Sequence, residues 1–273
     1  IMLNKILLPS VIFLFLIKIF ALNYTTFDLF GDEAQYWLWS KDIDFGYFSK
    51  PPFLAWVIRV YTDIVGDSFV ALKLLPSFIY LLIAWSVYGL FINSGLNKKD
   101  SFAGCLIFLF IPAVSFSSFI ISTDLFLLLF WTLSLNELIK ITKKQSLKGF
   151  VLLGIFLGLG FLSKYAAVYF IMCLMLLVLL DKKFRKIFYN NLLGFGLSLL
   201  FILIIITPNI IWNINNDWIT VQHTSDNANF ANIEISLIRG LEFLFIQVLM
   251  LGPFIVLGGL IGLNKIDGKQ KIF

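Results

Sequence analysis

The chain has 273 residues, of which 60% are hydrophobic and 14% charged, and its mean hydropathy is +0.94. Charged residues make up about a quarter of an ordinary soluble domain, so this composition excludes one. The net charge of +5 does not indicate a nucleic-acid-binding protein, because the lysines and arginines flank apolar segments and form no single basic surface. We therefore expect an all-α polytopic membrane protein.

Apolar segments long enough to span a membrane recur along the chain. A helix needs about 20 apolar residues to cross a bilayer. The expected spans are 6–22, 68–92, two within 102–139, two within 149–180, 192–207 and 235–263, which makes about eight. The two longest segments are expected to form helical hairpins that turn near 118–123 and 163–165. Because the second hairpin is short, its turn is expected to leave a recess that contains Lys164.

Two features inside the expected spans have a structural interpretation. The spacing of Gly154, Gly158 and Gly160 is more typical of close helix packing than of a ligand site. Lys18 lies near one end of the first span, and its long side chain is expected to extend outward toward the lipid headgroups.

The distribution of charge predicts how the chain crosses the membrane. The turns at 93–100, 140–148, 181–191 and 264–271, together with Lys5, hold two thirds of the 21 lysines and arginines. Basic loops stay in the cytoplasm. Both chain ends are therefore expected in the cytoplasm. The polar connections are expected on the other side of the plasma (inner) membrane, and they comprise 23–67, 118–124 and 208–234.

The first of these connections, 23–67, carries an unusual mixture of acids, lysines, aromatic residues and a tandem proline. We expect amphipathic helices here. Asp32 has two interpretations: an N-cap with Gln35 three residues later, or a carboxylate beside Glu33 that takes a proton from a hydroxyl group. Lys50 precedes Pro51–Pro52, where the backbone is stiff. It is a candidate phosphate ligand, or else a lysine that reaches the headgroups.

Other polar residues fall at the remaining outer turns. Asp124 follows Ser122–Thr123, either as an ordinary helix cap or as a second acid brought beside Asp32. Lys164 lies between two short apolar helices, where a charge is costly and usually functional. His223 is the one histidine, and an unpartnered surface position is the simpler interpretation. With one histidine and two cysteines in apolar segments, no metal site or other cofactor is predicted.

Five sequence segments together resemble a known family. They read GDEAQYWLW at 31–39, SKPPFLAW at 49–56, STDLFLLLFWTLSL at 122–135, GLGFLSKYAA at 158–167 and TPNIIWNINNDW at 207–218. In this order they resemble the GT-C membrane glycosyltransferases, in the group of the protein O-mannosyltransferases, the aminoarabinose transferases and the Rgt-like enzymes. The chain also lacks a Walker loop and a GxGxxG motif, so a sugar donor that is already in the membrane fits better than a soluble nucleotide.

The resemblance implies a GT-C-type helix bundle that transfers a sugar, with inversion, from a polyprenyl-phosphate donor to an extracytoplasmic acceptor. Lipid A, lipopolysaccharide core, another glycan and a protein hydroxyl all remain open as acceptors. The implied catalytic residues are Asp32, Glu33 and Asp124, the implied donor-phosphate ligands are Lys50 and Lys164, and the candidate substrate contacts are Tyr47, Tyr165 and His223.

The chain departs from the family at two points. Ser49 stands where the aminoarabinose transferases carry an acid implicated in metal binding, which is a further reason to predict no metal. The family's additional C-terminal spans and soluble domain are missing, so residues 1–273 are expected to be one transmembrane domain, truncated at its C-terminal end. A secondary transporter or a flippase for lipid-linked intermediates is the alternative. It would be expected to carry inverted repeats and charges near the middle of the bilayer.

Overall fold

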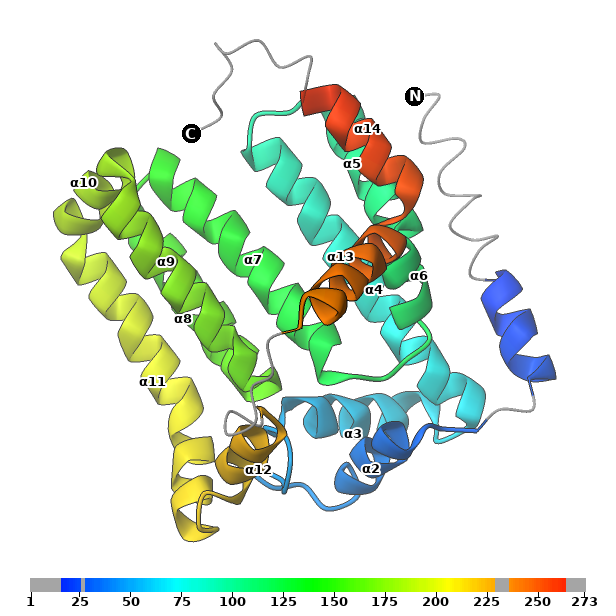
Figure 1. The fold of residues 1–273 in the computed structure, drawn as a ribbon. Helices are drawn as coiled ribbons and strands as arrows, with labels where there is room; N and C mark the ends of the chain where they lie inside the picture. Colours follow the sequence, from blue (N-terminus) through cyan, green and yellow to red (C-terminus); the bar gives the residue numbers. More distant parts are fainter. Residues whose placement is uncertain (1–15, 26–27, 229–235, 264–273) are drawn as a thin grey trace.

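The computed structural model describes residues 16–25, 28–228 and 236–263. These residues form helices and connecting loops and contain no strand, which confirms the predicted all-α class (Figure 1). A helix at 16–24 comes first. The others are α2 (Gly31–Trp39), α3 (Phe53–Val65), α4 (Phe69–Asn93), α5 (Lys98–Phe110), α6 (Pro112–Ser117), α7 (Thr123–Lys143), α8 (Leu147–Ser163), the 3-10 turn η1 (Tyr165–Ala167), α9 (Val168–Leu180), α10 (Lys182–Asn190), α11 (Leu192–Asn215), α12 (Ile219–Ala228), α13 (Leu237–Leu251) and α14 (Pro253–Leu263).

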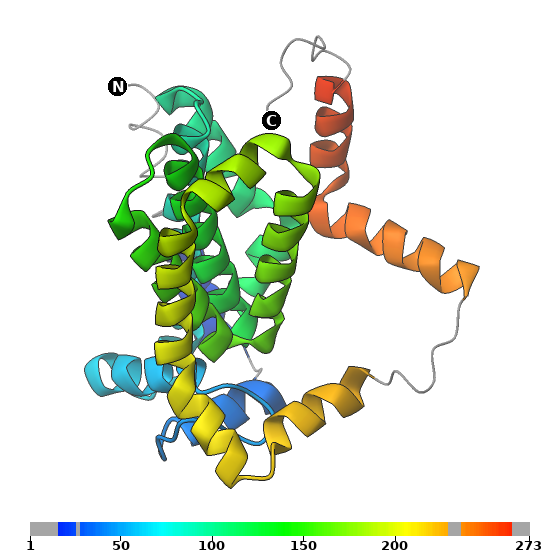
Figure 2. The ribbon, with the colours of Figure 1, turned by 90° about the vertical axis from the view of Figure 1, so that its left-hand side faces the viewer.

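The helices form an upright bundle and a platform that lies across one end of it (Figures 1 and 2). Within the bundle, α4 packs against α5 and α7, α7 packs against α8, and α8 packs against α11. We use "platform" for α2, α3, α12 and the loop of residues 40–52. The basic turn between α4 and α5 and the basic helix α10 lie at the opposite end of the bundle (Figure 1). The structure thus separates the predicted basic and acidic connections onto different ends.

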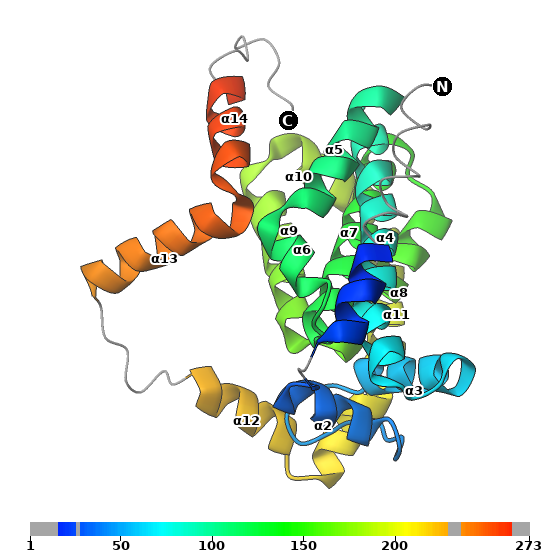
Figure 3. The ribbon, with the colours of Figure 1, turned by 90° about the vertical axis from the view of Figure 1, so that its right-hand side faces the viewer.

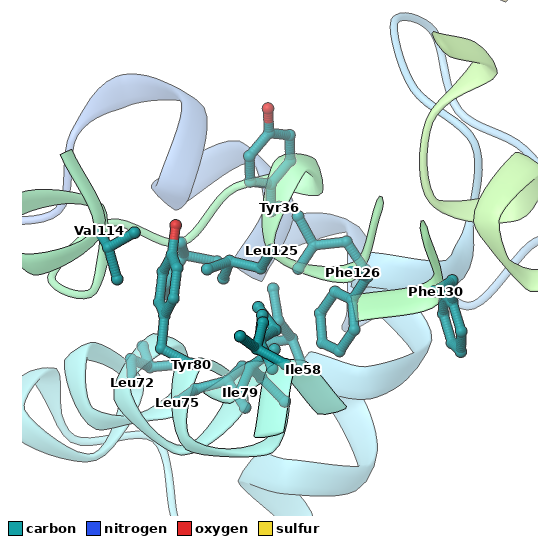
Figure 4. Packing of buried hydrophobic residues seen from close by; sticks show 14 residues of the cluster. Tyr36, Ile58, Leu72, Leu75, Ile79, Tyr80, Val114, Leu125, Phe126 and Phe130 are labelled. Atoms are coloured by element: carbon teal, nitrogen blue, oxygen red, sulfur yellow. The ribbon is translucent and has the colours of Figure 1, made fainter. Parts of the chain in front are cut away.

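A buried apolar cluster fixes the platform to the bundle (Figure 4). Tyr36 of α2 and Ile58 of α3 are 4% and 0% exposed, and both belong to this cluster. They pack with residues of the first turns of α4 and α7, among them Leu72, Leu125 and Phe126. Complete burial of one such side chain contributes about 1.5–3 kcal/mol. The platform is therefore a fixed part of the fold.

The predicted hairpin turns are confirmed, but the predicted number of spans is not. Residues 118–122 separate α6 from α7, and Lys164 interrupts the helix between α8 and η1. By length and composition, only α4, α7 and α11 could cross a membrane alone, and the described residues reach five spans when two bent helix pairs are included. Of the first expected span, only the helix at 16–24 lies within the described residues.

Two breaks that divide expected spans within the described residues have identifiable causes. Pro112 lacks an amide proton and holds Ile111 in an extended conformation (φ −58°, ψ 126°), which ends α5 after 13 residues. The expected span at 235–263 is two helices, α13 and the helix after it, which meet at 93° (Figure 3). They are separated by Gly252, whose φ of +91° is incompatible with a continuous helix.

The close approach of α8 and α11 confirms the predicted packing role of Gly154 and Gly158, whereas a Cβ on Gly160 would make only ordinary contacts at 3.6 Å with Ala167 and Phe130. A methyl group built on Gly154 would overlap the backbone oxygen of Ser198 and lie 2.8 Å from its Cα. On Gly158 it would lie 2.9 Å from Cβ of Ile205. The two helices are also joined by a hydrogen bond of 2.7 Å from Ser198 Oγ to the Phe150 carbonyl. Small residues thus allow the two backbones to touch.

A leucine at position 154 is therefore expected to separate α8 from α11. Overpacking costs about 1–3 kcal/mol where side chains can adjust, and more is expected here because the obstacle is backbone. Gly196→Leu is the matched control, since nothing lies within 4 Å of a Cβ at that position of α11. We expect Gly154→Leu to lower the unfolding midpoint in detergent micelles and Gly196→Leu to leave it nearly unchanged. Equal effects of the two variants would contradict this packing.

Candidate active site

The start of α2 places Asp32 differently from the N-cap expected for it. Phe30 is the N-cap, and its amide donates to Glu33 Oε2 at 2.9 Å. Asp32 instead lies inside the first turn of α2, and its side chain is exposed. Glu33, three residues after the cap, accepts the hydrogen bond from the N-cap amide, as the glutamate of a capping box does. The Asp32 carboxylate is therefore left without a hydrogen-bond or ion-pair partner among the described residues.

Glu33 is fully buried and joins three segments. Its Oε2 lies 2.5 Å from Lys73 Nζ of α4, and its Oε1 accepts a hydrogen bond of 2.8 Å from the amide of Ile121, just before α7. Glu33 is 0% exposed and Lys73 is 5% exposed. The Lys73 ammonium also lies 4.9 Å from the ring centre of Phe30. These contacts fix the start of α2 against α4 and α7, and they leave Glu33 no access to a substrate.

Lys73 is a site residue that the sequence analysis missed. It is the one charged residue within α4, an otherwise largely apolar helix of 25 residues. An isolated charge inside a span is the same signal that identified Lys164, and it would have identified Lys73 as well.

Asp124 and Lys164, which come from the two predicted hairpin turns, lie together. Lys164 Nζ donates to Asp124 Oδ1 at 2.7 Å. Asp124 is in the first turn of α7, and Lys164 is in the extended linker after α8. Their side chains are 62% and 35% exposed, so both can be reached from solution. The expected recess around Lys164 is not one of the two cavities described below.

Tyr36 marks the point where Asp32 and Asp124 converge. The pKa of its phenol is raised to about 12, first by burial and then by the negative charges of Asp32 and Asp124. Both carboxylates therefore influence the same phenol electrostatically, although they come from α2 and α7. Tyr36 was not among the residues expected at the site.

Lys50 is half-buried and, among the described residues, has no ion pair. Its carbonyl accepts a hydrogen bond of 3.2 Å from the amide of Tyr47. The Tyr47 hydroxyl lies 3.1 Å from the Trp39 carbonyl and 3.0 Å from the Asp42 carbonyl, and its ring stacks on Trp39 with centres 4.8 Å apart. Tyr47 is only 8% exposed. It was expected as a substrate contact, and here it shapes the loop that carries Lys50.

The asparagine-rich segment at the end of α11 fastens that loop to the bundle. Asn209 Nδ2 donates to the Phe45 carbonyl at 2.7 Å, and Trp212 Nε1 donates to Asp44 Oδ2 at 2.6 Å. In α12, Thr220 Oγ1 donates to the Tyr47 carbonyl at 2.6 Å. The motif at 207–218 therefore positions the platform loop.

The two remaining candidate substrate contacts, Tyr165 and His223, also have partners within the protein. The Tyr165 hydroxyl donates to Asn209 Oδ1 at 3.0 Å and accepts from Asn213 Nδ2 at 3.1 Å, which ties η1 to α11. His223 packs against Phe48 with ring centres 4.8 Å apart, and its Nε2 lies 2.9 Å from Asn227 Nδ2. His223 is thus partnered, contrary to the simpler interpretation of the sequence.

Neither of two cavities in the described part of the chain is lined by Asp32, Lys50, Asp124 or Lys164. One, of about 220 Å³, lies on the platform between Asp44 and Arg59. The other, of about 280 Å³, lies beside Lys18 in the bundle. No group of three histidine, cysteine or acidic side chains in the described residues is arranged to hold a metal ion.

The buried pair predicts a large loss of stability when one partner is neutralised. Glu33→Gln leaves the Lys73 ammonium buried without a counter-charge, which costs about 3–5 kcal/mol. The double variant Glu33→Met/Lys73→Met is expected to recover part of that loss. Lys41→Met is the control, because Lys41 pairs with Asp67 at the surface, where a pair contributes at most about 1 kcal/mol. Denaturant titration in micelles measures all three, and a Glu33→Gln variant as stable as the control would contradict the assignment.

The convergence on Tyr36 can be tested by titration. An ordinary tyrosine ionises near pH 10, so the absorbance difference between the wild type and Tyr36→Phe is expected to develop only around pH 12. Neutralising Asp32 or Asp124 removes a charge that disfavours tyrosinate. We therefore expect Asp32→Asn and Asp124→Asn each to lower the pKa of Tyr36, whereas Asp42→Asn leaves it unchanged. If only one of the two variants shifts it, the carboxylates do not converge there.

Comparison with known proteins identifies the family. Residues 49–212 match the family described as dolichyl-phosphate-mannose-protein mannosyltransferase. Lys50, Asp124 and Lys164 lie inside this match, and Asp32 precedes it. No solved structure matches the chain with statistical significance.

Three curated proteins of Rhizobium johnstonii (strain DSM 114642 / LMG 32736 / 3841) are similar to the chain. The lipid A galacturonosyltransferase RgtD is 32% identical over 242 residues, which are 87% of this chain and 50% of RgtD. The lipopolysaccharide core galacturonosyltransferases RgtB and RgtA are 28% and 26% identical, over 76% and 66% of this chain and 40% and 36% of their own lengths. The chain thus spans half the length of these relatives or less. Because the family match covers more than half of its residues, the chain belongs to the dolichyl-phosphate-mannose-protein mannosyltransferase family, of the GT-C, Rgt-like kind that its motifs indicated.

Proposed function

We propose that the protein is a membrane glycosyltransferase that moves a sugar from a polyprenyl-phosphate donor to a hydroxyl group on the extracytoplasmic side, with inversion. The observation that supports the proposal is that the charges of Asp32 and Asp124 both act on Tyr36, and that Lys164 pairs with Asp124, at the platform end of the bundle. These residues come from separate motifs, and the described structure gives Asp32 no partner of its own.

The names of the relatives suggest the substrates. RgtD is a lipid A galacturonosyltransferase, and RgtA and RgtB are lipopolysaccharide core galacturonosyltransferases. We propose galacturonic acid as the sugar and lipid A or lipopolysaccharide core as the acceptor. Both acceptors are membrane-anchored glycolipids, which suits a site on a platform against the end of a helix bundle.

In the proposed reaction, Asp32 is the general base. Its carboxylate accepts the proton of the acceptor hydroxyl while the hydroxyl oxygen attacks the anomeric carbon of the sugar. The bond from that carbon to the donor phosphate breaks on the opposite face, which inverts the configuration, and the phosphate leaves with the bonding electrons. Phosphate is already a good leaving group, so no general acid is needed.

The lysines would stabilise the leaving group. Lys50 is half-buried on a stiff stretch of backbone before Pro51, and an ammonium held there can meet the phosphate as its negative charge grows. Lys164 is a second such group, held at present by Asp124. Asp124, as the second acid, would orient Lys164 and face the acceptor. We assign Glu33 a positioning role, because it is buried and anchors the turn that carries Asp32.

Removal of the base is expected to abolish most of the activity. Loss of a general base lowers the rate about 10²–10⁴-fold. The rate at which Asp32→Asn transfers galacturonic acid from the polyprenyl-phosphate donor to lipid A should therefore fall by that factor. Asp42→Asn, an exposed acid of the same loop, is the matched control and should keep the wild-type rate. A fully active Asp32→Asn protein would refute the role of Asp32. Uptake of the donor into vesicles without any transfer would instead support the transporter or flippase.

A further inference from the structure

The larger cavity lies away from the proposed active site. It has a volume of about 280 Å³ and is enclosed by the helix at 16–24, α4, α5 and α6. Figure 3 shows the first helix beside α4 and α6 on the flank of the bundle. Nothing in the proposed transfer reaction uses this cavity.

One end of the cavity is polar and is dominated by Lys18. The Lys18 ammonium donates a hydrogen bond of 2.8 Å to Ser118 Oγ and another to the Ser118 carbonyl, and it lies 3.7 Å from the ring centre of Phe119. The hydroxyl-bearing residues Ser77 and Ser115 also line this end. Ser77 Oγ donates to the same Ser118 carbonyl at 3.1 Å. The lysine is only 7% exposed, so it does not extend outward as the sequence had predicted.

The charge of Lys18 is not balanced within the described residues. No carboxylate there lies within ion-pair distance of it, and its polar contacts are a hydroxyl and a carbonyl of one serine. Lys73 makes an instructive contrast, because it is equally buried and has Glu33 as a counter-ion at 2.5 Å. A buried charge without a counter-charge is strongly destabilising. A negatively charged ligand would supply what Lys18 lacks.

The other end of the cavity is apolar. Leu81 lies one turn, about 6 Å, further along α4 than Ser77, and it lines the cavity with Leu109. Ile17 also lines the cavity and is 47% exposed in the described part of the chain. Since α4 begins at the platform, the polar end faces the platform and the apolar end extends toward the middle of the bundle. A lipid in the adjacent leaflet has this arrangement, with its headgroup outward and its chain inward.

We propose that this cavity binds a lipid phosphate, with the phosphate at Lys18 and the first part of the hydrocarbon chain along Leu81 and Leu109. Small-molecule sites have volumes of about 300–1,000 Å³, and at about 280 Å³ the cavity is just below this range. It would therefore hold only a headgroup and the start of one chain, while the rest of the lipid lies in the bilayer. The phosphate oxygens would accept hydrogen bonds from the Lys18 ammonium and from the Ser77 and Ser115 hydroxyls. Such charge-assisted bonds are stronger than the bonds to the Ser118 oxygens that Lys18 now makes.

The test is a binding measurement, which stands whether or not the protein transfers sugar. Purified, delipidated protein is titrated with polyprenyl phosphate, with phosphatidylglycerol and with inorganic phosphate, and native mass spectrometry counts the bound molecules. We expect at least one lipid to bind tightly. Lys18→Met should weaken the binding of that lipid about tenfold or more. Lys41→Met, which replaces a surface lysine, should not weaken it. Preference for polyprenyl phosphate would identify a second site for the carrier lipid, and equal binding would identify a phospholipid site.

A second variant distinguishes the lipid from free phosphate and protects the test against misfolding of Lys18→Met. Leu81→Trp fills the apolar end and leaves the ammonium in place. It should weaken lipid binding but not the binding of inorganic phosphate. The proposal is overturned if either folded variant binds both lipids with wild-type stoichiometry and affinity, or if inorganic phosphate competes equally with them.

Discussion

The buried contact between Glu33 and Lys73 determines where the candidate catalytic groups lie. Taking both charges out of water costs several kcal/mol, and their attraction repays this only when the remaining polar atoms are also satisfied. Here the second oxygen of Glu33 is satisfied by the amide of Ile121. The three partners thus come from α2, from α4 and from the turn before α7. Asp32 and Asp124 each lie within three residues of this junction, so their separation depends on it.

A second set of contacts holds the other half of the site. The side chains of Asn209, Trp212 and Thr220 bond to the loop that carries Lys50. Tyr165, the residue next to Lys164, bonds to Asn209 as well. The loop is therefore attached to α11 and α12 at several points. Groups that must meet a reacting phosphate need to be held by rigid elements, and here both the acidic and the basic groups are.

Much of this arrangement could be predicted from the sequence, because span length and charge placement are local properties. They placed the turns at 118–123 and at Lys164 on one end of the bundle, which is the end where the structure pairs Asp124 with Lys164. Long-range partners could not be predicted. Whether Asp32 or Glu33 faces inward depends on Lys73, 40 residues away, and the burial of Lys18 depends on Ser118, 100 residues away. The described residues contain fewer span-length helices than expected, because the break at Pro112 and the bend at Gly252 divide apolar segments that hydropathy alone treats as continuous.

The charges at the platform end also suggest an order of events. Lys164 is neutralised by Asp124 in the free protein, whereas Lys50 has no ion-pair partner among the described residues. An arriving donor phosphate would therefore meet Lys50 first, because binding to Lys164 requires displacing or sharing a carboxylate. In the proposed reaction, a phosphate that drew Lys164 toward itself would leave Asp124 without its counter-ion, and an acceptor hydroxyl could then donate to Asp124. The Asp124–Lys164 pair would then couple donor binding to acceptor binding, and Asp32 would meet the hydroxyl only when both substrates are present.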